Sequence, residues 1–235
     1  MLIRPILAMT AAEFHSCEDF SGRIGWMSCL FSPYGTGLSN LPQRLPEGSL
    51  LVLSDYTPMQ GHDPQVIEKQ LCTCIDRFSC CGVLLDFQRT GNAQASALAA
   101  SLVEALPCPV AVSAGYAKEL DCPVFLPPVP PDTPLTEHIA PWTGREIWLE
   151  LALDGQRIVL TQQGAEITPL PHWQGSAEGF AEEQLRCHYR IETTQDKAIF
   201  TLWRTREDLE KLLEEANELG ITTAVALYQE LGYIL

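Results

Sequence analysis

Short apolar segments recur along the chain and are separated by polar stretches. They cover residues 2–9, 24–31, 49–54, 82–87, 109–113, 123–127, 146–152 and 222–228. The run Val83-Leu84-Leu85 is typical of them, because it is too short for a helix and has no polar side. Such runs are characteristic of parallel strands that are buried on both faces. The pattern therefore predicts a series of buried parallel strands.

Other segments between these strands repeat their apolar residues at helical spacing, namely 64–78, 94–106 and 205–219. The last of them begins with a Thr205–Asp208 pair that resembles a capping box, and Gly220 follows its end. Strands that alternate with helices form parallel βαβ units, and a closed barrel leaves no free edge. We therefore predict an α/β fold of the (β/α)8 TIM-barrel type, with residues 1–235 as a single domain.

Two regions depart from this alternation. Segments 32–48 and 127–134 are rich in proline or glycine and show no helical pattern, so we expect some barrel helices to be reduced. Residues 154–204 instead alternate as antiparallel strands, with turns expected at Asp154-Gly155 and Gln163-Gly164. We predict that they form a small antiparallel insertion between the seventh strand and the last helix.

Composition excludes several classes of partner. The chain has 15 lysines and arginines against 30 acidic residues, a net charge of −15, and no basic cluster. It would be repelled by phosphate backbones and anionic lipids, so we expect neither nucleic acid nor membrane as a partner. The apolar N-terminus is interrupted by Arg4 and Pro5, which argues against a secretory signal. Nine cysteines at irregular spacing do not suggest a disulfide framework, and we expect a reduced, cytoplasmic compartment.

The sequence predicts no metal site and no cofactor. Cys72-Thr73-Cys74 and Cys80-Cys81 lack the spacing of zinc ligands, and the histidines show no ligand pattern. No glycine-rich phosphate loop follows any predicted strand. We interpret these cysteines as buried structural thiols.

Polar and aromatic residues gather where the predicted strands end. In α/β barrels the C-terminal ends of the strands carry the chemistry, so this end is the expected site. We predict that six residues converge there on one pocket for a polar, sugar-like ligand: Asp55, Tyr56, Asp86, Gln88, Tyr116 and Tyr228. Tyrosine rings would contact the sugar faces, and the carboxylates and amide would bind its hydroxyls.

The carboxylates at these strand ends have alternative interpretations. Asp55, Asp86 and Glu230 could form a cluster that holds a sugar hydroxyl or a cation. Asp55 could instead cap a turn, and Asp86 could only hold strand ends together. Glu150 lies within the predicted seventh strand, where it is either a site residue or one half of a buried ion pair.

At the fourth predicted strand the chain resembles the family 18 glycoside hydrolases, the chitinase-like barrels. In that family this strand carries D-x-x-D-x-D-x-E, and the motif positions fall here on Cys81, Leu84, Asp86 and Gln88. Only Asp86 matches. The C-terminal segment 219–232 also resembles the family's last helix and strand, with Tyr228 in place of the aromatic that floors the sugar site.

The resemblance implies a sugar-binding barrel, but the residues argue against the family's reaction. The family's last motif glutamate protonates the leaving oxygen, and the substrate's own acetamide is the nucleophile. Gln88 is a neutral amide and cannot be a general acid. The sixth strand, Val124-Phe125-Leu126, is followed by Pro127 instead of ending in the family's Tyr-Asp pair.

Three functions follow as hypotheses. The chain is interpreted as a chitinase-like barrel that lacks the catalytic acid and acts as a non-catalytic carbohydrate-binding or scaffold protein. The alternative is a glycoside hydrolase that uses other carboxylates, with Asp86 and Glu230 as the catalytic candidates and Asp55 in support. A purely structural protein with a filled barrel mouth is the third. The sequence leaves the ligand and the oligomeric state open.

Overall fold

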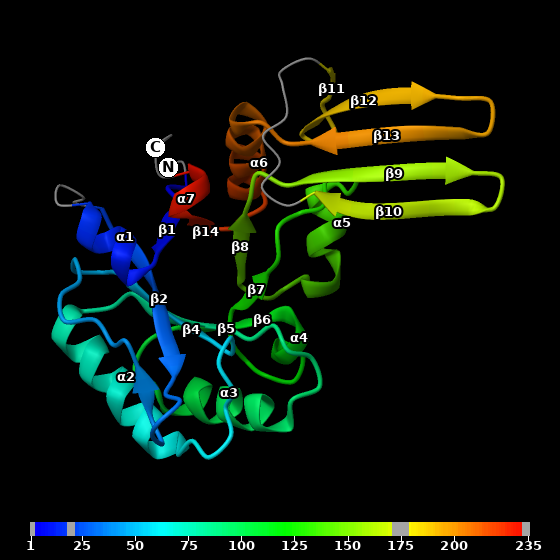
Figure 1. Ribbon diagram of the computed structural model, residues 1–235. Helices are drawn as coiled ribbons and strands as arrows, with labels where there is room; N and C mark the ends of the chain where they lie inside the picture. Colours follow the sequence, from blue (N-terminus) through cyan, green and yellow to red (C-terminus); the bar gives the residue numbers. More distant parts are fainter. Residues whose placement is uncertain (1–2, 18–21, 171–178, 232–235) are drawn as a thin grey trace.

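The computed structural model describes residues 3–17, 22–170 and 179–231, and its largest part is a closed barrel of parallel strands (Figure 1). The strands run in the order β1-β14-β8-β7-β6-β5-β4-β2, and pairing of β1 with β2 closes the ring. They are β1 (Ile6–Met9), β2 (Ile24–Phe31), β4 (Leu50–Ser54), β5 (Gly82–Asp86), β6 (Val110–Ser113), β7 (Val124–Leu126), β8 (Ile147–Leu151) and β14 (Thr223–Leu227). The predicted TIM-barrel-like fold is confirmed. The first predicted segment began at residue 2, which lies outside the described residues.

The helices around the barrel are unequal, as expected. The long ones, α2 (Pro64–Phe78), α3 (Ala93–Ala105) and α6 (Arg206–Glu218), fall on the segments with helical spacing. The short ones are α1 (Ala11–Ser16), α4 (Ala114–Ala117), α5 (Leu135–Ile139), α7 (Tyr228–Leu231) and the 3-10 turn η1 (Ala140–Trp142). Segment 32–48 holds only the two-residue strand β3 (Leu38–Ser39), and segment 127–134 has no helix.

The ends of the long helices follow from local residues. The Asp63 carboxylate accepts a hydrogen bond from the Gln65 amide, and Pro64 begins α2. At α6, Thr205 and Asp208 form the predicted capping box, with the Asp208 carboxylate accepting from both the amide and the hydroxyl of Thr205. These caps place the helix starts at the positions that the sequence indicated.

A second, antiparallel sheet lies between β8 and α6, and its hairpins project away from the barrel (Figure 1). Its order is β10-β9-β13-β12-β11. Its strands are β9 (Gly155–Thr161), β10 (Gly164–Leu170), β11 (Phe180–Glu182), β12 (Cys187–Thr193) and β13 (Lys197–Trp203). Gly164 pairs with Thr161 at the predicted hairpin, but no hairpin forms at Asp154-Gly155, because β9 begins there and leaves the barrel. That the chain is one domain with this sheet as an insertion stays a prediction.

Large side chains fill the barrel interior. Leu84, Phe125, Trp148 and Val225 belong to one buried cluster inside the ring, while Val83 and Leu85 of β5 face the helices. The Trp148 ring requires a glycine at position 82, since a Cβ there would lie 2.9 Å from its Cη2 atom. The packed interior leaves the C-terminal mouth as the open end of the barrel.

A candidate functional site at the barrel mouth

A cavity of about 490 Å³ opens at the C-terminal ends of β5, β6, β7, β8 and β14. Its volume lies in the range of small-molecule sites, roughly 300–1,000 Å³. The wall combines aromatic and proline rings with carboxylates, an amide and hydroxyls. Its lining is Phe87, Gln88, Thr90, Ser113, Ala114, Gly115, Tyr116, Phe125, Pro127, Pro128, Glu150, Ala152, Asp154, Leu227 and Glu230.

Asp86 and Gln88 form a pair at the end of β5. The side-chain amide of Gln88 donates a hydrogen bond to the Asp86 carboxylate, while Gln88 itself is exposed to the cavity. Burial raises the pKa of Asp86, and the nearby Asp55 carboxylate adds to this, although hydrogen bonds with Gln88 and Ser113 act in the opposite direction. Position 88 thus carries a neutral hydrogen-bonding group at the end of β5.

Asp55 holds the loop after β5 in place. Its carboxylate is only 1 % exposed and accepts hydrogen bonds from the backbone amides of Gln88, at 2.8 Å, and Arg89, at 2.9 Å. The Arg89 guanidinium donates to the Tyr56 carbonyl at 2.7 Å, and the Tyr116 hydroxyl donates to the Arg89 carbonyl. Asp55 thus lies outside the cavity wall, because both of its oxygens are turned to this loop.

Glu150 is the group of the cavity with the most altered acidity. Burial raises its pKa to about 8, and repulsion from the Asp86, Asp154 and Glu230 carboxylates contributes in the same direction. At neutral pH the protonated form of Glu150 is therefore favoured. Such a carboxyl group can donate a hydrogen bond or a proton into the cavity.

Glu230 and Tyr228, both on α7, point in different directions. Glu230 lines the cavity, and its carboxylate accepts a hydrogen bond from the Leu153 amide at 2.9 Å. The Tyr228 hydroxyl instead accepts a hydrogen bond from the Cys17 thiol at 3.0 Å, and Tyr228 is not part of the cavity wall.

The six residues predicted to converge on one pocket are only partly brought together. Gln88 and Tyr116 line the cavity, and Asp86 is hydrogen-bonded to Gln88. The other three, Asp55, Tyr56 and Tyr228, lie outside the cavity wall.

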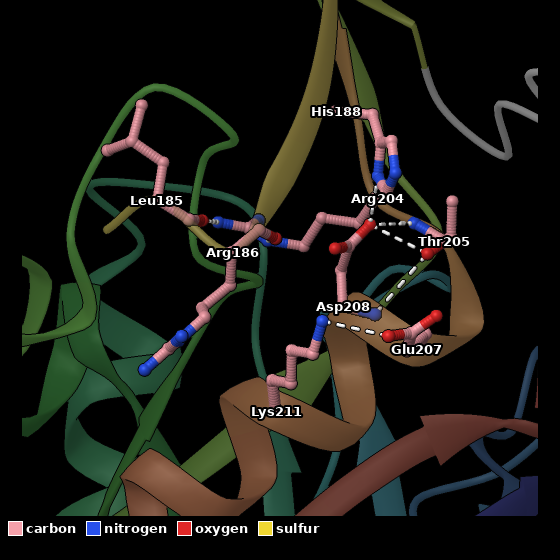
Figure 2. Close-up of polar contacts among 8 residues, drawn as sticks. All are labelled: Leu185, Arg186, His188, Arg204, Thr205, Glu207, Asp208 and Lys211. Carbon is pink, nitrogen blue, oxygen red and sulfur yellow. Dashed lines mark hydrogen bonds and ion pairs between the residues drawn. The ribbon is translucent and has the colours of Figure 1, made fainter. Parts of the chain in front are cut away.

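The proline wall of the cavity is held from the second sheet by Arg204, at the end of β13. The buried Arg204 guanidinium donates to the backbone carbonyls of Val129 and Pro130, the latter at 3.1 Å, directly after the cavity residues Pro127 and Pro128. It also donates to the carbonyls of Leu185 and Arg186, each at 3.1 Å (Figure 2). One side chain therefore ties β11–β12 to the segment that forms the cavity wall.

The same junction continues into α6. The capping carboxylate of Asp208 is buried and also accepts a hydrogen bond from His188 Nδ1 of β12 at 2.8 Å (Figure 2). On the far side of the proline segment, the Gln156 amide of β9 donates to Asp132 at 3.0 Å. Polar contacts from three elements thus fix the second sheet against the barrel.

Comparisons with known proteins agree on the architecture. No protein-family model matches the chain, and no curated protein matches it. Among solved structures it is similar to the chitinase-like agglutinin of Robinia pseudoacacia, with a TM-score of 0.61, 12 % identity, and coverage of 94 % of this chain and 93 % of that one. The spore cortex-lytic enzyme SleL of Bacillus cereus gives a TM-score of 0.57 at 9 % identity, over 95 % and 70 % of the two chains. A family GH18 chitinase from Cycas revoluta, in complex with allosamidin, gives 0.55 at 10 % identity, over 96 % and 94 %.

The fold is that of a chitinase-like barrel. At these identities the likeness concerns the fold alone. A mutant of the Cycas revoluta chitinase was solved in complex with (GlcNAc)4, so the same fold holds an oligosaccharide in that protein.

Two residues at the cavity, Glu150 in its lining and Arg204 behind its proline wall, are not among the site residues predicted from the sequence. The sequence left Glu150 open as either a site residue or one half of a buried ion pair, and the signal was its charge among the apolar residues Ile147, Trp148, Leu149 and Leu151. Arg204 was not singled out at all, since its carbonyl partners lie up to 75 residues away along the chain. For Glu150, the charged residue within an apolar strand was the signal from which a site residue could have been predicted.

The described part of the chain shows no group of three or more histidine, cysteine, aspartate or glutamate side chains arranged to hold a metal ion. Within the same residues no helix has the length and apolar composition to cross a membrane. The cysteines are free thiols, and burial raises the pKa of several of them, to about 12 for Cys80 and about 11 for Cys108. Thiols of this kind are poor nucleophiles at neutral pH.

Proposed function

We propose that the chain binds a neutral carbohydrate in the cavity at the barrel mouth and does not hydrolyse it by the chitinase mechanism. The observation that carries this proposal is the Asp86–Gln88 pair, which places an amide, and no proton donor, at the end of β5 beside an open cavity. Nine free thiols support our prediction of a reducing, cytoplasmic compartment for this binding.

The lining suits a sugar better than a charged or purely apolar ligand. Gln88, Thr90 and Ser113 offer hydroxyl and amide groups, and Glu150 in its protonated form adds a donor. Tyr116 is half-buried and packs edge-to-face on Phe87, with ring centroids 5.9 Å apart. Sugar sites combine hydrogen-bonding groups with aromatic rings in this way. The neighbouring acidic groups would repel an anionic ligand.

Filling the cavity without disturbing the fold tests the binding proposal. A Cβ added at Gly115, which lines the cavity, would meet no atom within 4 Å, so a side chain can start there without a clash and the test substitution is Gly115→Trp. The matched control is Gly35→Trp, at an exposed glycine outside the cavity whose added Cβ would meet only the Ser32 hydroxyl at 3.7 Å. We expect wild type and Gly35→Trp to bind (GlcNAc)4 in a calorimetric titration, and Gly115→Trp to lose at least tenfold in affinity.

The proposal fails if wild type does not bind chitin oligosaccharides, or if Gly115→Trp binds them as tightly as wild type. Thermal unfolding of each variant separates a blocked cavity from a damaged fold. Product analysis after long incubation with the oligosaccharide should show no cleavage by wild type.

A second candidate function is hydrolysis with Glu150 as the proton donor. The observation that favours it is the pKa of about 8, which keeps Glu150 protonated at neutral pH beside other carboxylates. Asp86 or Glu230 would then supply the second carboxyl group of a two-carboxylate glycosidase. Cleavage by wild type that disappears in Glu150→Gln, with oligosaccharide binding retained, would favour this function over simple binding.

A further inference from the structure

The second sheet presents two faces of opposite character, because side chains of neighbouring strands that pair directly share a face. One face carries Glu166, Arg157, Arg190, Glu192 and Lys197. The other is formed by three rows of paired residues. We call it the apolar face: Ala165, Leu160, Ala198 and Thr193; Ile167, Ile158, Phe200 and Ile191; Pro169, Gln156, Leu202, Tyr189 and Phe180.

No residue of the apolar face is charged, and much of it is open to solvent. Leu160, Ile167, Phe180 and Ile191 are 40, 55, 66 and 44 % exposed, and they come from four different strands. On the charged face the equivalent aliphatic residue Ile199 is only 6 % exposed. The hairpins that carry the apolar face project beyond the barrel, so helices of the barrel do not cover their outer part (Figure 1).

The exposed apolar area approaches what a specific interface requires. A large apolar side chain offers on the order of 200 Å², so the four residues together expose roughly 400 Å². A standard interface buries about 800 Å² on each partner. The exposed Ala165, Pro169 and Thr193 and the partly exposed Ile158, Phe200 and Tyr189 add to the four. Exposed patches of several hundred Å² typically mark interaction sites.

We propose that the apolar face is the interface of a homodimer, in which two copies stack their second sheets face to face. The exposed apolar area supports this occupant, because it is a large part of what each partner of a standard interface buries. Two copies with a net charge of −15 repel each other over most of their surfaces, and the apolar face is where they can meet without bringing like charges into contact. A face without charges can also pack on the same face of a second copy without like-charge repulsion, as a two-fold interface requires.

The alternative geometry, pairing through the free edge of β10, is disfavoured. Pro169 has no amide hydrogen to donate to a new strand, and the charged Glu166 lies on the same edge strand. Stacked sheets, in contrast, need no backbone hydrogen bonds, and apolar side chains from both sheets fill the space between them.

Charge substitutions on one strand test the interface with a matched control. Ile167→Glu places a carboxylate in the middle row of the apolar face, on the edge strand β10. Thr168→Glu adds the same charge to the next residue, which is also exposed but lies on the charged face. Ile191→Glu repeats the test on β12. The measurement is sedimentation velocity of the full chain over a concentration series, with circular dichroism to verify folding.

We expect wild type and Thr168→Glu to form dimers at micromolar concentrations, and both isoleucine variants to remain monomeric. Dimerisation of wild type should strengthen as salt is raised, because salt screens the repulsion between the two acidic chains. A wild type that is monomeric throughout the series would overturn the proposal. So would a dimer that survives both Ile167→Glu and Ile191→Glu, or one that Thr168→Glu dissociates equally.

Discussion

The two sides of the barrel mouth hold their carboxylates in opposite ways. On the β4–β5 side, Asp55 is buried, and both of its carboxylate oxygens accept hydrogen bonds from backbone amides. The carboxylate therefore holds the loop after β5 in place. On the β8 side, Glu150 faces the cavity among other acidic groups, and its pKa rises to about 8. Both residues lie near the ends of strands, so the surroundings of each carboxylate, more than its position, separate one that is bound to backbone amides from one whose pKa is raised.

Each side of the mouth also depends on one buried charged side chain that binds main-chain groups. Asp55 binds amides of the loop after β5, and Arg204 binds carbonyls of the proline segment after β7. A charged group that satisfies several backbone groups is costly to remove, because its partners are left buried and unpaired. The comparison therefore predicts the order in which substitutions at these positions lower the free energy of unfolding.

The largest effect is expected for Arg204→Met, which keeps an unbranched side chain but removes every hydrogen bond to four carbonyls. The free energy of unfolding should fall by about 3–4 kcal/mol, as for the loss of a buried polar network. The control is Arg190→Met on β12, whose exposed ion pair with Glu192 should contribute less than about 1 kcal/mol. Urea unfolding measures both, and equal losses in the two variants would contradict the role of Arg204.

Asp55→Ala should come next, with a loss of about 2–3 kcal/mol in unfolding free energy, since two part-buried amides lose the buried carboxylate that accepts from them. Hydrogen exchange should report the same change locally, as faster exchange of the Gln88 and Arg89 amides. Asp76→Ala, at an exposed aspartate within α2, is the control and should change stability little. If the substitution weakened sugar binding and left stability and hydrogen exchange unchanged, Asp55 would be a ligand-binding residue. The contrast between a structural Asp55 and a cavity-lining Glu150 would then be wrong.

Glu150 predicts a pH dependence with a defined sign. The folded state favours the protonated form up to about pH 8, whereas the unfolded chain ionises near the ordinary pKa of 4.5. Stability is therefore unaffected by Glu150 below pH 4.5, falls as the pH rises toward 8, and is lowest above it. After discounting for water in the cavity, the loss is on the order of 2 kcal/mol.

Glu150→Gln removes this ionisable group at nearly constant shape. The variant should match wild type near pH 4 and be more stable than wild type above pH 8, which thermal unfolding across the pH range can measure. A parallel pH profile for the two proteins would show that Glu150 is solvated and ionises normally.

These features differ in how far the sequence could predict them. Helix α2 was predicted at its observed bounds because the Asp63 cap, Pro64 and the apolar stripe are all local signals. Arg204 was missed because its partners, Val129 and Leu185, come from distant segments that only the folded chain brings together. The sequence could predict that a residue lies near the end of a strand, but it could not predict in which direction the side chain points.

Tyr228 shows the same limit within the candidate site. Its place after the last strand suggested a sugar-stacking role, but its hydroxyl bonds to Cys17, which is 211 residues away in the sequence. The Asp86–Gln88 pair was more predictable, since two residues two apart on one strand share a side. The predicted ligand-binding roles of these residues stay predictions.

The smallest effect is expected for Tyr56→Ala. The Tyr56 side chain is 79 % exposed and lies outside the cavity wall, and the contact that Tyr56 makes with the Arg89 guanidinium uses its backbone carbonyl, which alanine retains. Stability should change by less than about 0.5 kcal/mol, and affinity for (GlcNAc)4 should stay the same. Tyr116→Ala is the contrasting variant, because its half-buried ring packs on Phe87 and lines the cavity.

The pair of tyrosine variants therefore measures how far a bound oligosaccharide extends. If only Tyr116→Ala weakens binding, the sugar is confined to the cavity between β5 and β14, the side of the mouth where Glu150 lies. If Tyr56→Ala weakens binding as well while unfolding is unchanged, the oligosaccharide must continue across the Asp55 loop toward the β4 side. An exposed aromatic ring would then serve as an outer platform for a further sugar unit, and the two sides of the mouth would share one ligand.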